Sequence, residues 1–141
     1  MGGCLRDILL SQKPKDFDIA TNASPENIKK LFRNCLLIGR RFRLAHIRFG
    51  REIIEVSTFR AQSKKKSFKH RKIATHGMLL RDNVYGTIEE DVWRRDFTMN
   101  ALYYNIADFS LVDYCGGLTD IQNKTVRIIG EPRIRYQEDP V

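Results

Sequence analysis

The segment Asp16-Phe17-Asp18-Ile19-Ala20 alternates polar and apolar residues, a pattern typical of a β-strand with one face in water. Side chains two positions apart on a strand point the same way, so Asp16 and Asp18 are predicted to project together while Phe17 and Ile19 face the core. Two carboxylates this close repel each other unless a cation lies between them. Their oxygen atoms suit Mg²⁺ or Mn²⁺, and two metals bridged by such a pair can serve a phosphoryl transfer. The pair alone is weak evidence, because Asp-x-Asp occurs by chance in many proteins.

Helix and strand signals follow this segment without strict alternation. The run Ser24-Pro25-Glu26 predicts a helix start, with a hydroxyl cap, a proline at the first helical position and an acid in the first turn. Residues 44–49 and 52–59 alternate and predict a hairpin that turns at Gly50-Arg51. Residues 87–100 are predicted to form one helix that opens with a capping box of Thr87 and Glu90. Further helices are predicted at 6–12 and 132–138, and further strands at 102–106, 111–114 and 125–129. Together they predict an α+β (mixed α/β) domain, with a mixed twisted β-sheet and flanking helices.

The chain is strongly basic, with 141 residues and a formal net charge of +8 at pH 7. Its length fits one domain, and its charge favours a polyanionic partner: nucleic acid, an anionic membrane surface or an acidic protein. Residues 60–77 concentrate Lys and Arg among few apolar residues. They predict a mobile basic loop, which either captures RNA phosphates or is simply solvated.

Composition excludes several classes of protein. No apolar run approaches the ~18 residues of a membrane span, so we expect no membrane association. Cys4, Cys35 and Cys115 are far apart and odd in number, which fits neither a zinc site nor a disulfide framework. Free thiols indicate a reducing compartment, so we expect a cytoplasmic protein.

Two stretches outside the first strand carry groups suited to anions or cations. Gly2-Gly3 lets the backbone approach phosphates, although a lone Gly-Gly is more often only a turn. Arg6 can pair with a phosphate or with a neighbouring carboxylate. Glu55 takes the opposite face of its predicted strand from Val56, which supplies a third carboxylate or an ordinary solvent-facing residue.

A further stretch, residues 94–100, concentrates two guanidinium groups, an acid and an amide. Arg95 with Asp96 could grip the phosphate and ribose of a nucleotide, and Asn100 could hydrogen-bond a sugar or a base edge. The alternative is a surface ladder of ion pairs on a plain helix, which would contribute little.

Taken in order, five stretches resemble a known family: residues 2–7 (GGCLRD), 16–23 (DFDIATNA), 55–60 (EVSTFR), 94–102 (RRDFTMNAL) and 113–120 (DYCGGLTD). Together they closely resemble the bacterial poly(A) polymerase and CCA-adding tRNA nucleotidyltransferase family. The resemblance covers essentially the whole chain and is more specific than any one motif. It implies a polymerase-β-like nucleotidyltransferase fold.

The resemblance also implies a role for each matched residue. Asp16 and Asp18 would bind the catalytic metals, Mg²⁺ or Mn²⁺, and Asp96 would complete the catalytic set. Glu55 and Arg60 would support them, and residues 113–120 match a motif thought to act as a flexible element. The nucleotide-binding residues would be Gly2, Gly3, Arg6, Asp7, Arg95 and Asn100.

Residues 37–47 (LIGRRFRLAHI) are similar to the poly(A) polymerase branch of the family rather than to the CCA-adding branch. The resemblance therefore implies a template-independent adenylyltransferase that adds AMP from ATP to RNA 3′ ends and releases pyrophosphate. We expect a monomer that binds RNA and ATP. The alternatives are a CCA-adding tRNA nucleotidyltransferase and, from another class, a non-catalytic RNA-binding module. The acidic residues of the motifs argue against the last.

The two ends of the chain depart from the family pattern. The glycine motif normally follows an apolar strand, yet here it stands at residues 2–7. Residues 136–141 resemble the beginning of the family's motif of acids and arginines that reads the base, and the arginines expected after it are not in this sequence. We therefore expect residues 1–141 to be a head-domain fragment, truncated at both ends. The sequence leaves base selectivity and the activity of the isolated chain open.

Overall fold

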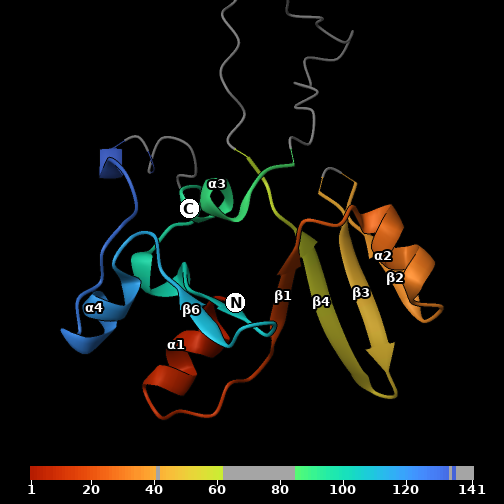
Figure 1. Ribbon diagram of the computed structural model, residues 1–141, viewed down its shortest axis with the longest axis horizontal. Helices are drawn as coiled ribbons and strands as arrows, with labels where there is room; N and C mark the ends of the chain where they lie inside the picture. The colour runs from red at the N-terminus through yellow and green to blue at the C-terminus, as the bar shows by residue number, and fades with distance from the viewer. Residues whose placement is uncertain (41, 62–84, 134, 136–141) are drawn as a thin grey trace, which may run out of the picture.

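The structure, a computed structural model, describes residues 1–40, 42–61, 85–133 and 135. Two sheets carry the architecture, one with strand order β1-β4-β3-β2 and one made of β5 and β6 (Figure 1). The elements are α1 (Gly3–Leu9), β1 (Asp18–Thr21), α2 (Pro25–Leu31), β2 (Cys35–Ile38), β3 (Leu44–Phe49), β4 (Glu52–Thr58), α3 (Ile88–Val92), η1 (Thr98–Asn100, a 3₁₀ turn), β5 (Tyr103–Asn105), β6 (Ser110–Val112) and α4 (Gly117–Gln122). The predicted α+β class is confirmed.

Two predicted segments fall largely outside these residues. Most of the basic loop predicted at 60–77 and most of the helix predicted at 132–138 lie beyond what the structure describes. In the part that it does describe, no helix is long and apolar enough to cross a membrane.

The four-stranded sheet is built around the predicted hairpin. β3 and β4 pair antiparallel, β2 adds antiparallel to β3, and β1 adds parallel to β4. Helix α2 starts as predicted, because the Ser24 side chain accepts a hydrogen bond from the backbone N–H of Asn27. Its Ile28 packs with Ala45, Ile47 and other buried residues of the sheet in one hydrophobic cluster. Covering one face of the sheet leaves the opposite face of β1, β4 and β3 free to line a site.

Figure 1 places the remaining elements beyond the β1 edge of this sheet, with α1, α3, α4 and the β5–β6 hairpin gathered together. A second hydrophobic cluster unites Val92 of α3, Ala101, Tyr103 of β5 and Ile129. The molecule thus has two halves, the four-stranded sheet and this second group of elements, and Met1 and Gly2 connect them. The nitrogen of Met1 donates to the carbonyl of Asp18 at 2.7 Å, and the N–H of Gly2 donates to the carbonyl of Leu102 at 3.0 Å.

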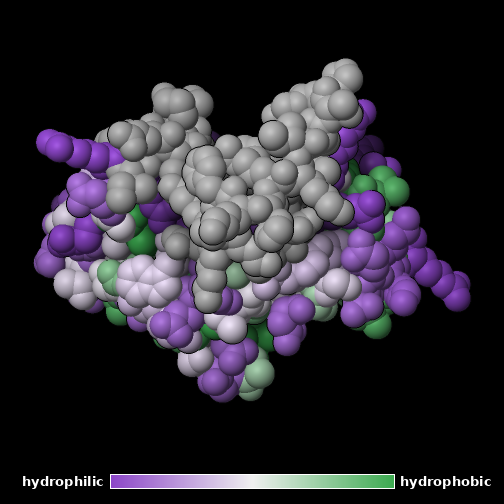
Figure 2. Space-filling model, turned by 90° about the horizontal axis from the view of Figure 1, so that it is seen from above, coloured by the Kyte–Doolittle hydropathy of each residue, from purple (hydrophilic) through white to green (hydrophobic). Residues whose placement is uncertain are grey.

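On the coloured part of the face in Figure 2, hydrophilic residues cover much of the surface, including the end that carries α2 and β2. Exposed Lys29 and Lys30 belong to α2. This distribution fits the basic composition of the chain and places positive charge on the helix that backs the sheet.

The single helix predicted over residues 87–100 is wrong beyond its first turns. The capping box of Thr87 and Glu90 is confirmed, but α3 ends at Val92 and the chain is extended at Phe97. The reason is tertiary pairing: Phe97 forms an antiparallel bridge with Ile128. The predicted strand at 125–129 is accordingly reduced to this short pairing, which holds the segment after α3 in place.

The start of the first strand was also mispredicted. β1 begins at Asp18, so Asp16 precedes it, and Phe17 and Ile19 remain 57% and 46% exposed instead of entering the core. The cause is position, because β1 is the edge of its sheet and α2 packs nearer to β2 and β3. Alternation correctly predicted a strand here, but it gave neither the first residue of the strand nor the face that is covered.

Helix α4 was not predicted from the sequence. Its start is organised by Asp113, whose carboxylate accepts hydrogen bonds from the backbone N–H groups of Cys115, Gly116, Gly117 and Leu118. Asp120 of α4 accepts from the Thr98 hydroxyl at 2.7 Å and is ion-paired with Arg127. In this structure the 113–120 motif therefore braces η1.

We expect Gly117→Ala to lower the free energy of unfolding by about 2–3 kcal/mol, because the new Cβ would overlap the backbone carbonyl of Thr98. Gly116→Ala is the matched control. It meets no neighbouring atom, and its cost of about 1 kcal/mol comes only from the left-handed backbone at φ 79°. Urea unfolding monitored by circular dichroism measures both variants. Equal destabilisation would contradict the close packing of α4 on η1.

Candidate active site

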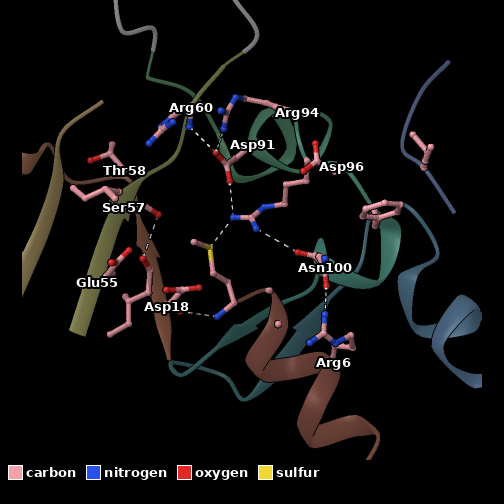
Figure 3. Close-up of a pocket in the computed structure, with 18 of the residues that line it drawn as sticks. Arg6, Asp18, Glu55, Ser57, Thr58, Arg60, Asp91, Arg94, Asp96 and Asn100 are labelled. Carbon is pink, nitrogen blue, oxygen red and sulfur yellow. Dashed lines mark hydrogen bonds and ion pairs between the residues drawn. The ribbon is translucent and has the colours of Figure 1, made fainter. Parts of the chain in front are cut away.

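An open cavity of about 820 Å³ lies where the two halves of the molecule meet. Its walls come from the start of α1, from β1 and β4, and from the segment between α3 and η1. Figure 3 shows the carboxylates of Asp18 and Glu55 on one side of this space, with Arg6 and Asn100 opposite them. The volume suits a nucleotide-sized ligand.

The acidic wall follows from strand register. Asp18 of β1 and Glu55 of β4 are direct partners in the parallel pairing, so their side chains lie next to each other on the same face. Both line the cavity. Among the described residues Asp18 has no ion-pair partner, whereas an oxygen of Glu55 lies 3.1 Å from Nε2 of His46 on β3. The structure thus brings together two of the three acids that the sequence singled out around the first strand.

Asp16 stands apart from this pair. It is exposed, it precedes β1, and it is not among the residues that line the cavity. The described residues contain no group of three or more His, Cys, Asp or Glu side chains placed to hold a metal. Asp18 and Glu55 nevertheless fit Mg²⁺ chemically, because Mg²⁺ in nucleotide enzymes is held by one or two carboxylates together with water and substrate phosphates.

The basic wall begins at α1. Arg6 donates through Nε and Nη2 to Asp7, at 2.9 and 2.7 Å, and through Nη1 to the side-chain oxygen of Asn100 at 2.9 Å. The structure therefore joins three residues that the sequence placed near a nucleotide. Arg6 and Asn100 line the cavity, but Asp7 does not and instead neutralises Arg6 from the side.

The glycines at the start of α1 also differ in their placement. Gly2 is buried, and its N–H is already donated to the carbonyl of Leu102 at 3.0 Å, so it is not available to a phosphate. Gly3 is the first residue of α1 and lines the cavity with Gly2. The absence of a side chain at both positions keeps this wall open.

Arg94, Arg95 and Asp96 all line the cavity after α3. Asp96 is exposed, and its backbone carbonyl accepts from Ile129, which holds it at the mouth. The side chain of Arg95 is mostly buried. It forms an ion pair with Asp91 and donates a hydrogen bond from Nε to the Tyr103 hydroxyl at 2.7 Å.

Asp91, which organises this arginine group, was not predicted as a site residue from the sequence. Asp91 is 5% exposed and accepts hydrogen bonds from Arg94 at 3.1 Å, Arg95 at 3.3 Å, Tyr103 at 2.5 Å and the backbone of Arg60 at 3.0 Å. The sequence offered one signal for this role: Asp91 stands four residues before Arg95 on a predicted helix, a spacing at which an acid and an arginine can form an ion pair.

The charge states of this group follow from its surroundings. Burial by itself raises the pKa of the Asp91 carboxyl, but the hydrogen bonds from Tyr103 and Arg60 and the charges of Arg95 and Arg94 outweigh it, so the pKa lies below its usual value. Burial raises the pKa of the Tyr103 hydroxyl. Asp91 is therefore an anion and Tyr103 a neutral phenol at neutral pH.

Arg60 completes the basic wall from the end of β4. Burial, followed by the charge of Arg94, lowers the pKa of its guanidinium. The group lies over the ring of Phe42, with Cζ 4.1 Å from the ring centre, and it lines the cavity. Guanidinium groups that repel each other in this way favour an anionic ligand between them.

Comparison with known proteins matches residues 1–127 to the family described as the poly A polymerase head domain. The chain belongs to that family. As a poly A polymerase head domain, it is 62% identical over its whole length to Poly(A) polymerase I of Haemophilus influenzae, of which it covers 32%. It is 34% identical to the CCA-adding enzyme of Bacillus velezensis, with 99% of this chain and 33% of that protein covered. The chain thus spans about a third of the length of the relatives it matches.

A solved structure shares the fold of this head domain. The CCA-adding enzyme of Bacillus stearothermophilus in complex with CTP superposes with a TM-score of 0.78 at 29% identity, over 99% of this chain and 31% of that one. The nucleotidyltransferase fold implied by the sequence motifs is confirmed.

We expect Asp18→Asn to raise the free energy of unfolding by about 0.5 kcal/mol in EDTA at low salt and pH 8, because it removes repulsion between neighbouring carboxylates. Asp16→Asn, at an exposed position outside the cavity, is the control and should leave it unchanged. Urea unfolding measures the difference. A loss of stability in Asp18→Asn would contradict the placement of Asp18 beside Glu55.

Proposed function

We propose that this chain is the catalytic head of a template-independent polynucleotide adenylyltransferase, which transfers AMP from ATP to RNA 3′ ends and releases pyrophosphate. The observation that carries this proposal is the cavity itself: Asp18 and Glu55 face Arg6, Arg94 and other guanidinium groups across one open space. A triphosphate with a bound divalent cation has the charge distribution that such a space accommodates.

Similarity to relatives supports adenylate addition over CCA addition. Identity is 62% to a Poly(A) polymerase I and 34% to a CCA-adding enzyme, over almost the same residues. Two residues of the 37–47 stretch, Gly39 and Phe42, lie close together, since a Cβ at Gly39 would overlap the carbonyl of Phe42, and the Phe42 ring contacts Arg60 at the cavity. Phe42, which belongs to the stretch that favours the poly(A) polymerase branch, is therefore in contact with the candidate site.

Mg²⁺ is the proposed cofactor, with Mn²⁺ as the alternative ion. Asp18 and Glu55 would hold it together with substrate phosphates, and Asp16 would join them from the segment before β1. When bound, the metal would lower the charge repulsion between substrate phosphates and make the 3′-hydroxyl a better nucleophile.

The residues of the chain itself would perform binding and orientation. Arg6, Arg94 and Arg95 would bind phosphate oxygens of the triphosphate and balance the negative charge that these oxygens carry. Asp96, exposed at the mouth of the cavity, would contact the ribose. RNA would approach through attraction to the net charge of +8. We propose a cytoplasmic monomer with RNA 3′ ends and ATP as its partners.

In the complete protein that carries this chain, Asp18→Ala or Asp16→Ala should reduce nucleotide incorporation by roughly a hundredfold or more, because each removes a carboxylate from the metal-binding set. Far-ultraviolet circular dichroism should show an intact fold. Glu52→Gln, at an exposed position of the same sheet, is the matched control and should keep the wild-type rate. Full-rate incorporation by Asp18→Ala or Asp16→Ala would contradict the assignment of that carboxylate.

Nucleotide choice separates the proposed function from its alternatives. Offered single nucleotides with an unstructured RNA, the complete protein should incorporate AMP only, in a Mg²⁺-dependent reaction. Offered a trimmed tRNA with CTP and ATP, it should not add C before A. Ordered CCA addition would replace our proposal with the CCA-adding function, and RNA binding that ignores Mg²⁺ and nucleotide would indicate a binding module.

A further inference from the structure

The basic wall is supported by a buried pair of residues that the proposed reaction does not use directly. Asp91 of α3 and Tyr103 of β5 are both 5% exposed. The Tyr103 hydroxyl donates to Asp91 Oδ2 at 2.5 Å and accepts from Arg95 Nε at 2.7 Å. One hydroxyl thus connects a buried carboxylate to a guanidinium that lines the cavity.

Arg95 is held on nearly every side. Its Nη2 group donates to Asp91 Oδ2 at 3.3 Å and contacts the sulfur of Met1 at 2.9 Å, and its Nη1 group donates to the carbonyl of Asn100 at 3.3 Å. Of the five N–H groups of an arginine, only one on Nη1 then lacks a partner within the described residues. Nη1 lies beside Gly2, 3.6 Å from where a Cβ would stand. Because the other N–H groups are bonded, the guanidinium of Arg95 can offer this remaining N–H to a ligand in essentially one orientation.

We propose that Asp91 and Tyr103 are positioning residues that hold Arg95 in the orientation in which it binds a phosphate of the incoming nucleotide. The inference rests on the proposed function, because it assigns the nucleoside triphosphate as the ligand of this wall. Binding costs less when the side chain is ordered in advance, so the pair raises affinity for the nucleotide through the orientation of Arg95.

Geometry and charge support a positioning role for both residues. Asp91 remains an anion while Tyr103 keeps its proton, so the phenol can donate in one direction and accept in the other. Asp91 also holds Arg94 and the backbone of Arg60, both of which line the cavity. Three arginines of the basic wall are therefore fixed to one buried acid.

The hydroxyl of Tyr103 can be separated from its ring. The ring packs edge-on against Phe59, with centroids 6.0 Å apart, and lies under Arg95, with Cζ 5.1 Å from its centre. Tyr103→Phe keeps this packing and removes only the two hydrogen bonds. Tyr104→Phe is the matched control, because the neighbouring hydroxyl belongs to an exposed residue outside the cavity.

In the complete protein, Tyr103→Phe is expected to raise both the KM for ATP and the Kd of ATP about tenfold, the equivalent of one hydrogen bond to a charged group. The kcat should change by less than about threefold, because Arg95 binds substrate and transition state alike. Tyr104→Phe should match the wild type. Wild-type ATP affinity in Tyr103→Phe would overturn the proposal, as would a fall in kcat with KM and Kd unchanged.

A double-mutant cycle with Arg95→Lys adds a measurement that general structural damage would not reproduce. Lysine lacks the Nε–H that bonds Tyr103, so Tyr103→Phe should weaken ATP binding by less than about twofold in that background. Equal effects in both backgrounds would overturn the proposal. Equilibrium ATP binding is measured apart from RNA extension. A wild-type protein that binds ATP but extends no RNA would refute adenylyl transfer, while the binding data would still decide the role of Tyr103.

Discussion

The parallel pairing of β1 with β4 is the interaction on which the cavity depends. β1 is short and lies at the edge of its sheet, yet this pairing sets Asp18 directly beside Glu55. Backbone hydrogen bonds fix the register, so the two carboxylates stay together although their charges repel. The backbone nitrogen of Met1 also donates a hydrogen bond to the carbonyl of Asp18, which links the segment before α1 to the same strand. The acidic wall is thus a product of strand register.

The basic wall balances this charge, and it is held by acids of its own. Arg6 pairs with Asp7, while Arg94 and Arg95 pair with Asp91. These acids relieve repulsion among the guanidinium groups when no ligand is bound. Asp91 does so from a buried position, where an unpaired carboxylate would be costly and several hydrogen bonds are needed to stabilise it. Negative and positive walls facing each other across one space are suited to a polyanion that carries a metal.

Sequence patterns predicted many of the separate elements and residues of the site, but they did not predict which distant residues contact one another. The capping signal of α2, the β3–β4 hairpin and the acids around β1 could be predicted, because each depends on neighbours in sequence. The helix expected over residues 87–100 failed because Phe97 pairs with Ile128, about thirty positions away. Asp91 looked like one more acid on a helix, since nothing local revealed that Tyr103 would meet it.

The amino-acid sequence by itself determined the family, the α+β class and the residue types that line the cavity, because motifs and periodicity are local properties of the chain. Tertiary structure alone decided which of those residues meet. It placed Glu55 with Asp18, left Asp16 outside the cavity and turned Asp7 toward Arg6. The physical reason is that strand register and long-range hydrogen bonds are set by the packing of distant segments, whose partners cannot be read from their own neighbours.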